Sequence, residues 1–307
     1  MMPLLWNWQG WYKPQAVGWQ GLAMCLGQRR DRMSTTESAL SDPDRRAPGV
    51  PRSRHFKTLR VIGALILREL ESSESRTSLG FLWAFIDPIA TIILMSLVFS
   101  VVSRVPPVGD SFPLFYMTGI VPFALFAALS SKAAAAPKFS RPLLSFPAVR
   151  ALDTIIARAI LHFFIQMVVF AFLAISIIRL YDLNPSIDAL LVIEALALAA
   201  CLGFGMGCLN AVLFLLVPSY ENLWSVFTRP LMLASGVLIP IDIVPEPYKS
   251  YLWWNPVAHP IELMRAAFYP EVGRENASAL FVFMVALTAF VIGLVMLHRL
   301  MRDALEG

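Results

Sequence analysis

Long apolar runs are the feature of this sequence that most restricts its fold. Of the 307 residues, 57% are hydrophobic and only 15% are charged, and the hydrophobic residues fall in separate stretches. About 20 apolar residues are needed to cross the hydrocarbon core of a bilayer. Because that core contains no water, a spanning segment must satisfy its own backbone hydrogen bonds, as an α-helix does. The sequence therefore predicts an all-α integral membrane protein.

Six stretches have the length and composition of membrane spans. Four of them contain no Asp, Glu, Lys or Arg, whereas the first contains Asp87 beside Pro88 and the fifth contains Arg229. An arginine near the end of a span can extend its side chain to the membrane surface. The expected spans are 81–103, 112–131, 159–178, 195–217, 222–241 and 277–297.

The first 55 residues differ from the rest of the chain. Residues 1–32 contain four of the eight tryptophans without a regular period, and residues 33–55 are polar and rich in proline and serine, which is typical of disorder. Met33 opens the polar stretch as a natural start would, so we expect residues 1–32 to be an upstream extension without a role. The predicted domains are a disordered or non-native extension over 1–55, an interface helix over 56–78 and a six-helix transmembrane domain over 79–303.

The interface helix is predicted from a helical period. Leu59, Ile62, Ile66 and Leu70 share one face, and the charged residues of the opposite face are Lys57, Arg60, Arg68 and Glu71. A helix half-buried against protein has the same pattern, but a span follows at once, which favours the membrane interface. Between the fifth and sixth spans, residues 242–276 are rich in proline and aromatic residues, and we expect them to form short re-entrant helices.

The distribution of Lys and Arg predicts the orientation. Six spans place both termini on one side, and from residue 52 onward that side carries thirteen Lys and Arg residues against five on the other. Since Lys and Arg are enriched in cytoplasmic loops, we expect both termini to be cytoplasmic. Topology also explains the net charge of +4, so we expect no nucleic-acid partner.

Common motifs of catalysis and nucleotide binding are missing from the sequence. It contains no Gly-x-x-x-x-Gly-Lys, no His-Glu-x-x-His and no Gly-x-Ser-x-Gly. The three cysteines and four histidines are scattered, so we expect no catalytic residue, metal site or cofactor in this chain. Gly203 and Gly207 lie one helical turn apart and indicate close packing of another helix. Asp87 and Glu194 lie near span ends, which favours an interfacial position over proton transfer.

The loop at 137–153, between the second and third spans, is divided by prolines. Lys138, Arg141 and Arg150 favour a position at the cytoplasmic surface, and its apolar side chains suited to the groove of a partner are Phe139, Leu143, Leu144 and Phe146. A connector lying on lipid headgroups is the alternative, and the composition of the loop does not separate the two.

An ordered set of short motifs then covers residues 56–300. These are Leu67-Arg68-Glu69-Leu70, Arg76-Thr77-Ser78-Leu79-Gly80-Phe81-Leu82-Trp83, Pro88, Leu144-Ser145-Phe146-Pro147, Asp153, Ala157-Arg158, Arg229-Pro230-Leu231, Ser235-Gly236, Trp253-Trp254-Asn255-Pro256, His259, Glu262 and Arg265. With these motifs the chain resembles the permease subunits of type-2 ABC exporters, within them the capsular polysaccharide export branch. Thr77 stands where that family usually has tyrosine, and Asp87 stands where it often has glutamate.

The resemblance implies an inner-membrane homodimer with two ATP-binding subunits, which bind the ATP and Mg. It implies export of a lipid-linked acidic polysaccharide, with periplasmic and outer-membrane proteins continuing the path. It also implies a coupling helix within 137–153, where the expected contacts to the ATPase are Phe139, Arg141, Leu143, Leu144, Phe146 and Arg150. Aromatic rings suit sugar faces and basic groups suit acidic sugars, and the expected path residues are Arg68, Arg76, Phe81, Trp83, Trp253, Trp254 and Arg265.

The expected re-entrant helices contain two further signals. Glu262 and Arg265 are one helical turn apart, and we expect them to form an ion pair that braces this unit. Of Trp253 and Trp254, we expect one to anchor the unit in the membrane interface and the other to face the polymer path.

Three alternatives to capsule export are compatible with the sequence. The first is export of another lipid-linked glycan, such as O-antigen or teichoic acid. The second is a type-2 exporter of small molecules. The third is an integral membrane enzyme, such as a glycan or lipid transferase, which would need polar catalytic groups clustered at one membrane face.

Overall fold

The computed structural model describes residues 57–76, 80–103, 105–140, 149–273, 275 and 277–306, all within the unit Phe56–Gly307. The predicted extension over 1–55 lies outside the described residues. The regular elements of the described part are helices, and it contains no strand. The predicted all-α class is therefore confirmed.

Five helices are long and apolar enough to cross a membrane. They correspond to the first, second, third, fourth and sixth predicted spans. Their bounds are α3 (Gly80–Val102), α4 (Phe112–Ala128) with the π-helical turn η1 (Leu129–Ala133), α7 (Ala151–Leu180), α8 (Ala189–Leu216) and α12 (Ala279–Glu306).

Two of these helices begin earlier than predicted, because a carboxylate caps each N-terminus. Asp153 Oδ2 accepts a hydrogen bond from the backbone N of Arg150 at 3.2 Å, so that α7 begins before the apolar run. Asp188 Oδ1 accepts from the backbone N of Leu190 at 2.9 Å and of Leu191 at 3.3 Å, at the start of α8. Such side-chain caps satisfy N–H groups that have no partner inside the helix.

The fifth predicted span, 222–241, contains a shorter helix. Helix α9 (Ser219–Ala234) has 16 residues, which is about 24 Å against a hydrocarbon core of about 30 Å. The chain then turns at Gly236, whose φ of +77° is in the left-handed region that favours glycine, and continues to the 3-10 turn η2 (Ile241–Ile243). Only Trp224 of α9 is buried among the described residues.

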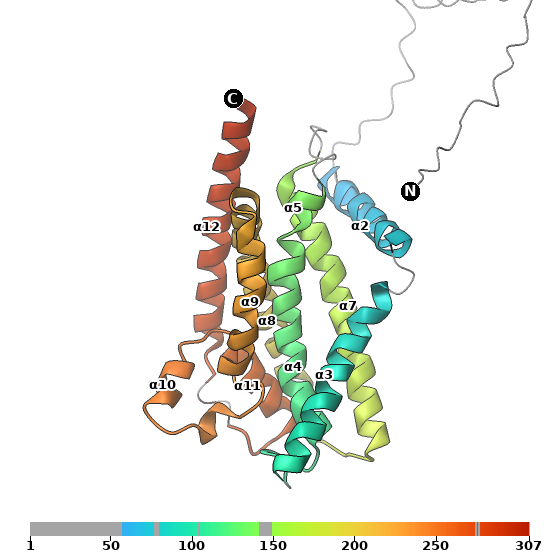
Figure 1. The fold of residues 1–307 in the computed structure, drawn as a ribbon, viewed down its shortest axis with the longest axis vertical. Coiled ribbons are helices and arrows are strands. Elements are labelled where there is room, and N and C mark those ends of the chain that lie inside the picture. The colour runs from blue at the N-terminus through green and yellow to red at the C-terminus, as the bar shows by residue number, and fades with distance from the viewer. Residues whose placement is uncertain are drawn as a thin grey trace, which may run out of the picture. The chain divides into compact units, whose positions relative to one another are not determined.

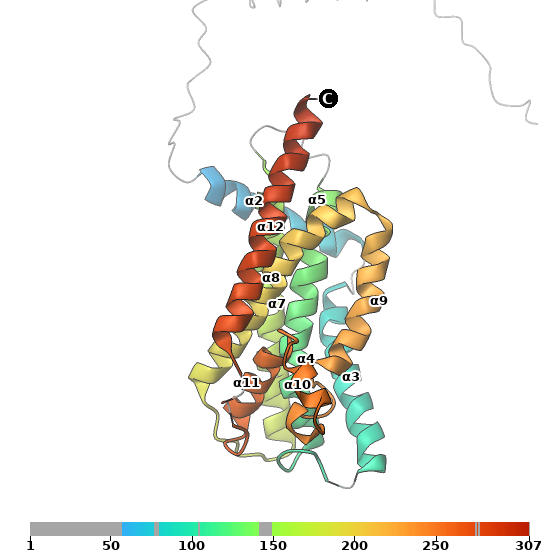
Figure 2. The ribbon, with the colours of Figure 1, turned by 90° about the vertical axis from the view of Figure 1, so that its left-hand side faces the viewer.

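The long helices run alongside one another in alternating directions (Figure 1). The predicted interface helix, α2 (Lys57–Arg76), lies at one end together with the short α5 (Ala136–Phe139) and the C-terminal end of α12. We call this end the connector end. Helices α10 (Tyr248–Leu252) and α11 (Ala258–Phe268) lie at the other, which we call the α11 end. Figure 2 shows α9 passing from the connector end towards the α11 end.

Helix α8 is the packing centre, because its glycines let neighbouring helices approach. A Cβ on Gly203 would lie 2.9 Å from Phe126 O of α4, and one on Gly207 would lie 2.6 Å from Leu129 O of η1. On another face of α8, a Cβ on Gly205 would collide with Ala286 O of α12. The predicted packing role of Gly203 and Gly207 is therefore confirmed.

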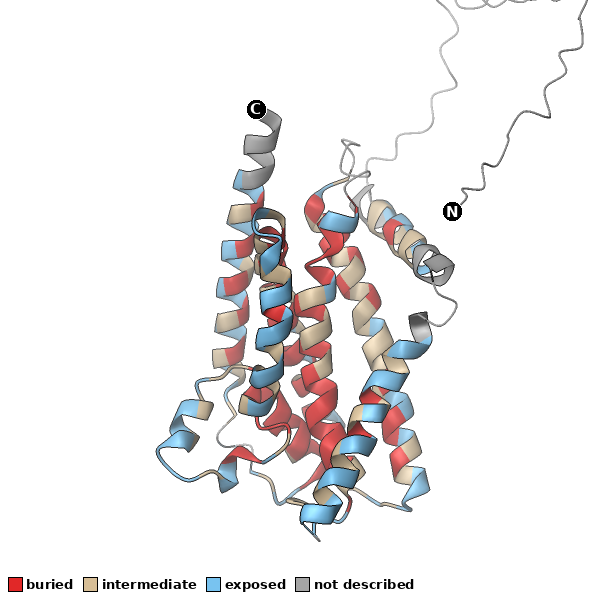
Figure 3. Ribbon diagram, in the orientation of Figure 1, coloured by how far each residue is buried: buried red, intermediate tan, exposed pale blue. Residues whose placement is uncertain are grey.

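Burial is concentrated on α4, α8 and α11, whereas α3 is largely exposed (Figure 3). The exposed side chains of α3 are nevertheless apolar, among them Leu94, Leu97 and Val101. A helix with apolar residues all round is suited to lipid or to another apolar helix.

Candidate functional site

Motifs far apart in the sequence meet at the α11 end. Asn255 Nδ2 donates to Ser235 Oγ at 2.8 Å and to the carbonyl O of Ala234 at 3.2 Å. Asn255 Oδ1 accepts from the backbone N of Val257 at 3.1 Å. One asparagine therefore ties the end of α9 to the turn that precedes α11.

His259 joins α10, α11 and the start of α12. The backbone N of Ser278 donates to His259 Nδ1 at 3.3 Å, so His259 Nε2 carries the proton that it shares with the carbonyl O of Trp253 at 3.1 Å. The imidazole centroid lies 5.2 Å from the ring of Trp253 and 5.3 Å from the ring of Phe281. This buried histidine has the contacts of a structural residue.

Arg265 is enclosed by three different segments. Its Nη1 donates to Glu262 Oε1 at 3.0 Å and its Nη2 donates to the carbonyl O of Val237 at 2.9 Å. The guanidinium carbon lies 4.6 Å from the ring centroid of Phe115. Both charged side chains are almost completely buried, at 0% and 3% exposed. The helical ion pair predicted for Glu262 and Arg265 is confirmed.

Burial shifts the pKa values of Glu262 and Arg265 in the directions that disfavour their charged forms. Loss of hydration raises the pKa of Glu262, and the nearby Arg265 charge opposes this change. Burial likewise lowers the pKa of Arg265, and Glu262 opposes it. Nearby, the hydrogen bond to Asp242 raises the pKa of Lys249, whose Nζ lies 2.8 Å from Asp242 Oδ1.

The two tryptophans of the predicted path have different surroundings. Trp253 is half-buried, and its Nε1 is buried without a hydrogen-bond partner among the described residues. The side chain of Trp254 is 76% exposed. The structure thus separates a packed ring from an exposed one, and the division of roles between them stays a prediction.

The remaining predicted path residues lie towards the connector end, on α2 and the start of α3. Trp83 is 61% exposed and Arg68 is half-buried. Arg76 and Phe81 lie in α2 and α3, but their side chains are outside what the structure describes. The structure does not bring this group together with Trp253, Trp254 and Arg265, which lie at the opposite end.

The predicted ATPase contacts are described only in part. Arg141, Leu143, Leu144 and Phe146 lie outside the described residues. Phe139 ends α5 and is 51% exposed, and Arg150 is the exposed residue before α7. Lys138 of α5 forms an ion pair of 2.7 Å with Glu221 at the start of α9. The described part of the loop 137–153, which we call the connector, therefore contacts helix α9 directly.

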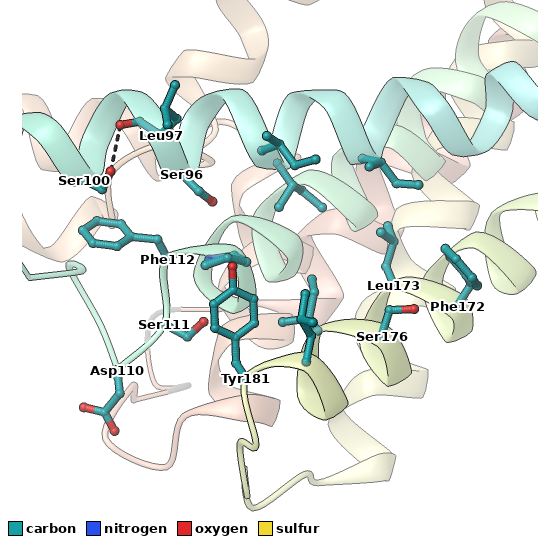
Figure 4. Close-up of a pocket in the computed structure, with 16 residues that line it drawn as sticks. Ser96, Leu97, Ser100, Asp110, Ser111, Phe112, Phe172, Leu173, Ser176 and Tyr181 are labelled. Atoms are coloured by element: carbon teal, nitrogen blue, oxygen red, sulfur yellow. Dashed lines mark hydrogen bonds between the residues drawn. The ribbon is translucent and has the colours of Figure 1, made fainter.

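A cavity of about 670 Å³ lies between α3 and α7 near the α11 end (Figure 4). Its wall is mainly apolar, with hydroxyl groups from Ser96, Ser100, Ser111 and Ser176. The hydroxyl oxygens of Ser96 and Ser111 are buried and have no partner among the described residues. No predicted path residue lines this cavity. The sequence contained one signal for it, because Ser96 and Ser100 are four residues apart in an apolar run and therefore lie on the same face of a helix.

The described residues contain no group of three or more His, Cys, Asp or Glu side chains that could hold a metal ion. The polar clusters described above are ion pairs and hydrogen bonds within α11 and between neighbouring segments. This arrangement holds segments together and presents exposed aromatic side chains.

Comparison with known proteins fits this architecture. Residues 60–269, more than half of the chain, match the ABC-2 type transporter family. The chain belongs to the ABC-2 type transporter family. The resemblance predicted from the motifs is therefore confirmed at the level of the family, which is a family of transport components.

The relatives within the ABC-2 type transporter family match over nearly their whole length. The chain is 31% identical over 246 residues to a polysialic acid transport protein KpsM of Escherichia coli, which covers 80% of this chain and 95% of KpsM. A second KpsM of that species is 29% identical over 245 residues, with the same coverage. The capsule polysaccharide export inner-membrane protein CtrC of Neisseria meningitidis serogroup A is 27% identical over 243 residues, covering 78% of this chain and 91% of CtrC.

Proposed function

We propose that this chain is the channel-forming permease subunit of an ATP-driven exporter that moves lipid-linked capsular polysaccharide from the cytoplasm to the periplasm. The observation that carries this proposal is the match to KpsM and CtrC over almost their full lengths, since those proteins are named for polysialic acid transport and capsule polysaccharide export. The match to the ABC-2 type transporter family, over residues 60–269, includes both ends of the helical bundle and the motifs at its α11 end.

The proposed topology has six spans in the bacterial inner membrane, with α9 as the fifth. Helix α9 is shorter than the bilayer core, but the turn at Ser235–Gly236 and η2 extend the segment towards the α11 end. The connector end is then cytoplasmic, in agreement with the bias of Lys and Arg. Helix α2 lies in the cytoplasmic interface, and α10 and α11 form the re-entrant unit at the periplasmic mouth.

The proposed assembly contains two copies of this chain and two ATP-binding subunits. The partner subunits bind ATP and Mg, and they act on the connector between α4 and α7. Exposed apolar side chains on α9, such as Leu223 and Phe227, are suited to contact with the second copy or with lipid. Periplasmic and outer-membrane export proteins would continue the polysaccharide path.

The predicted path residues fall into two groups in this proposal. Arg68, Arg76, Phe81 and Trp83 act where the lipid-linked end enters, and Trp254 acts where the sugar chain leaves. Arg265 is enclosed by its own subunit, so we assign it a bracing role in the re-entrant unit rather than a contact with sugar. Trp253 belongs to the same brace through His259.

Deletion of the gene followed by localisation of the polysaccharide tests the proposal. Export predicts that polymer accumulates inside the cell and that re-expression of the chain returns it to the surface. Loss of all polymer would instead indicate a role in synthesis, as for a membrane transferase. Purification of the tagged chain separates the classes independently, because an exporter subunit should bring an ATPase with it.

A further inference from the structure

Arg158 of α7 lies where three elements meet at the connector end. Its Nε donates to Glu69 Oε1 of α2 at 2.9 Å, and its Nη2 donates to the same oxygen. On its other side, the guanidinium carbon lies 4.9 Å from the ring centroid of Phe139 in α5. One side chain of α7 therefore contacts both the interface helix α2 and the connector.

Helix α2 buries little of its surface against the bundle. Among the α2 residues whose burial is described, 60–70, only Leu65 is buried. Glu69 follows Leu65 by four residues and lies on the same face of the helix. Leu67 is 64% exposed and points away from that face. Because apolar contact has little directionality, the bond from Arg158 to Glu69 fixes how α2 is placed against α7.

A second ion pair provides a comparison within the same connector. Lys138 and Glu221 join α5 to α9, and their side chains are 42% and 35% exposed. Arg158 and Glu69 are only 16% and 20% exposed. Exposed pairs are screened by water and salt and constrain a structure weakly, whereas partly buried pairs are screened less. Of these two ion pairs, the one between Arg158 and Glu69 therefore constrains the structure more strongly.

We infer that Arg158 is the positioning residue that passes displacement of the connector to the interface helix. The inference rests on the proposed function, in which a partner ATPase acts on the connector. A shift of α5 moves the Phe139 ring against the guanidinium, and the two N–H groups bound to Glu69 carry α2 with it. Arginine suits this role because its planar group stacks on a ring and binds a carboxylate at the same time, which lysine cannot do.

The first experiment tests the contact in the permease without its partner. Cys25, Cys201 and Cys208 are replaced by serine, Leu67→Cys carries a spin label on the exposed face of α2, and label mobility is measured in nanodiscs. Arg158→Gln should increase the mobility, and the exchange Glu69→Arg with Arg158→Glu should restore it. Unchanged mobility in Arg158→Gln would overturn the inference.

The second experiment tests transmission in the complex with the ATPase. ATP binding should change the spectrum of the label at position 67, and Arg158→Gln should remove most of that change. Export should fall by about tenfold while basal ATP hydrolysis continues, as expected for a lost coupling between sites. Arg158→Lys should be intermediate, and Lys138→Gln, the matched control in the exposed pair, should behave as wild type.

The outcomes separate this inference from the proposed function. A full ATP-dependent change of the label in Arg158→Gln overturns the inference and leaves the exporter intact. If no ATPase co-purifies with the wild-type chain, the proposed function is refuted. The transmission of connector displacement to α2 is then refuted as well. The label in the permease alone still reports in that case whether Arg158 holds α2.

Discussion

Arg265 donates to Glu262 within a completely buried turn of α11, at a distance of 3.0 Å between Nη1 and Oε1. The same guanidinium binds Val237 O, in the segment that follows α9. The pair therefore fixes α11 against the end of the fifth predicted span, and it does so with charges that have lost their hydration.

Removal of one member of this pair should destabilise the protein strongly. Arg265→Met leaves the Glu262 carboxylate buried without its counter-charge, and changes of this kind cost about 3–5 kcal/mol. We expect Arg265→Met to reduce the amount of protein in the membrane and to lower its melting temperature in detergent. Glu262→Gln combined with Arg265→Met should recover part of the loss, because no charge remains buried. A double variant as unstable as the single one would contradict this account.

Glycine packing around α8 gives a second prediction. Gly205→Ala places a methyl group against Ala286 O, a backbone atom that cannot rotate away, and overpacking of this kind costs about 1–3 kcal/mol. A lower melting temperature is therefore expected. Gly63→Ala in α2 is the matched control, because a Cβ there meets nothing within 4 Å. The control should be neutral or slightly stabilising, since alanine favours helix by up to about 1 kcal/mol over glycine.

The proposed topology can be measured with reporter fusions. A reporter after Arg302 and one within 137–150 should report a cytoplasmic position, and one near Pro247 should report a periplasmic position. The reason is the excess of Lys and Arg at the connector end. A periplasmic signal after Arg302 would exclude six spans, and the five long helices alone would then have to account for the crossings.

Five of the six predicted spans and the family could be predicted because they depend on local sequence. An apolar run needs no distant contact to be recognised, and the motifs from Leu67 to Arg265 are short. The starts of α7 and α8 were not found from the apolar runs, because they depend on the hydrogen bonds that Asp153 and Asp188 accept from the backbone N of Arg150 and Leu190. Length alone also could not show that α9 ends at Ala234.

The candidate site was predictable as residues but not as contacts. Spacing predicted that Glu262 and Arg265 would pair, since they lie one turn apart. Nothing in the spacing indicated that Val237 O and the Phe115 ring would enclose Arg265, because those contacts depend on how distant segments pack. The link from Arg158 to Glu69 was missed for the same reason, although both residues belong to the recognised motifs.

Trp253 and Trp254 give the last prediction, because neighbouring residues of one type have opposite surroundings. The Trp253 ring packs on His259, and the Trp254 ring is 76% exposed. Trp253→Ala should reduce the amount of protein in the membrane. Because Trp253 is only half-buried, the loss of folding free energy should be smaller than that for a fully buried tryptophan, which is about 3–5 kcal/mol. Trp253→Phe should largely rescue, since it keeps an apolar ring and removes the buried Nε1–H that has no partner among the described residues.

Trp254→Ala should leave the amount of protein and the basal ATP hydrolysis of the partner unchanged, because no packing is lost. Export should nevertheless slow if the exposed ring contacts sugar faces along the path. Membrane amount is measured by immunoblot, export by surface polysaccharide per cell, and ATP hydrolysis on the purified complex. Normal amount and normal export in both alanine variants would exclude both roles. A fall in amount for Trp254→Ala would assign its ring to the membrane interface instead, where tryptophan is also favoured.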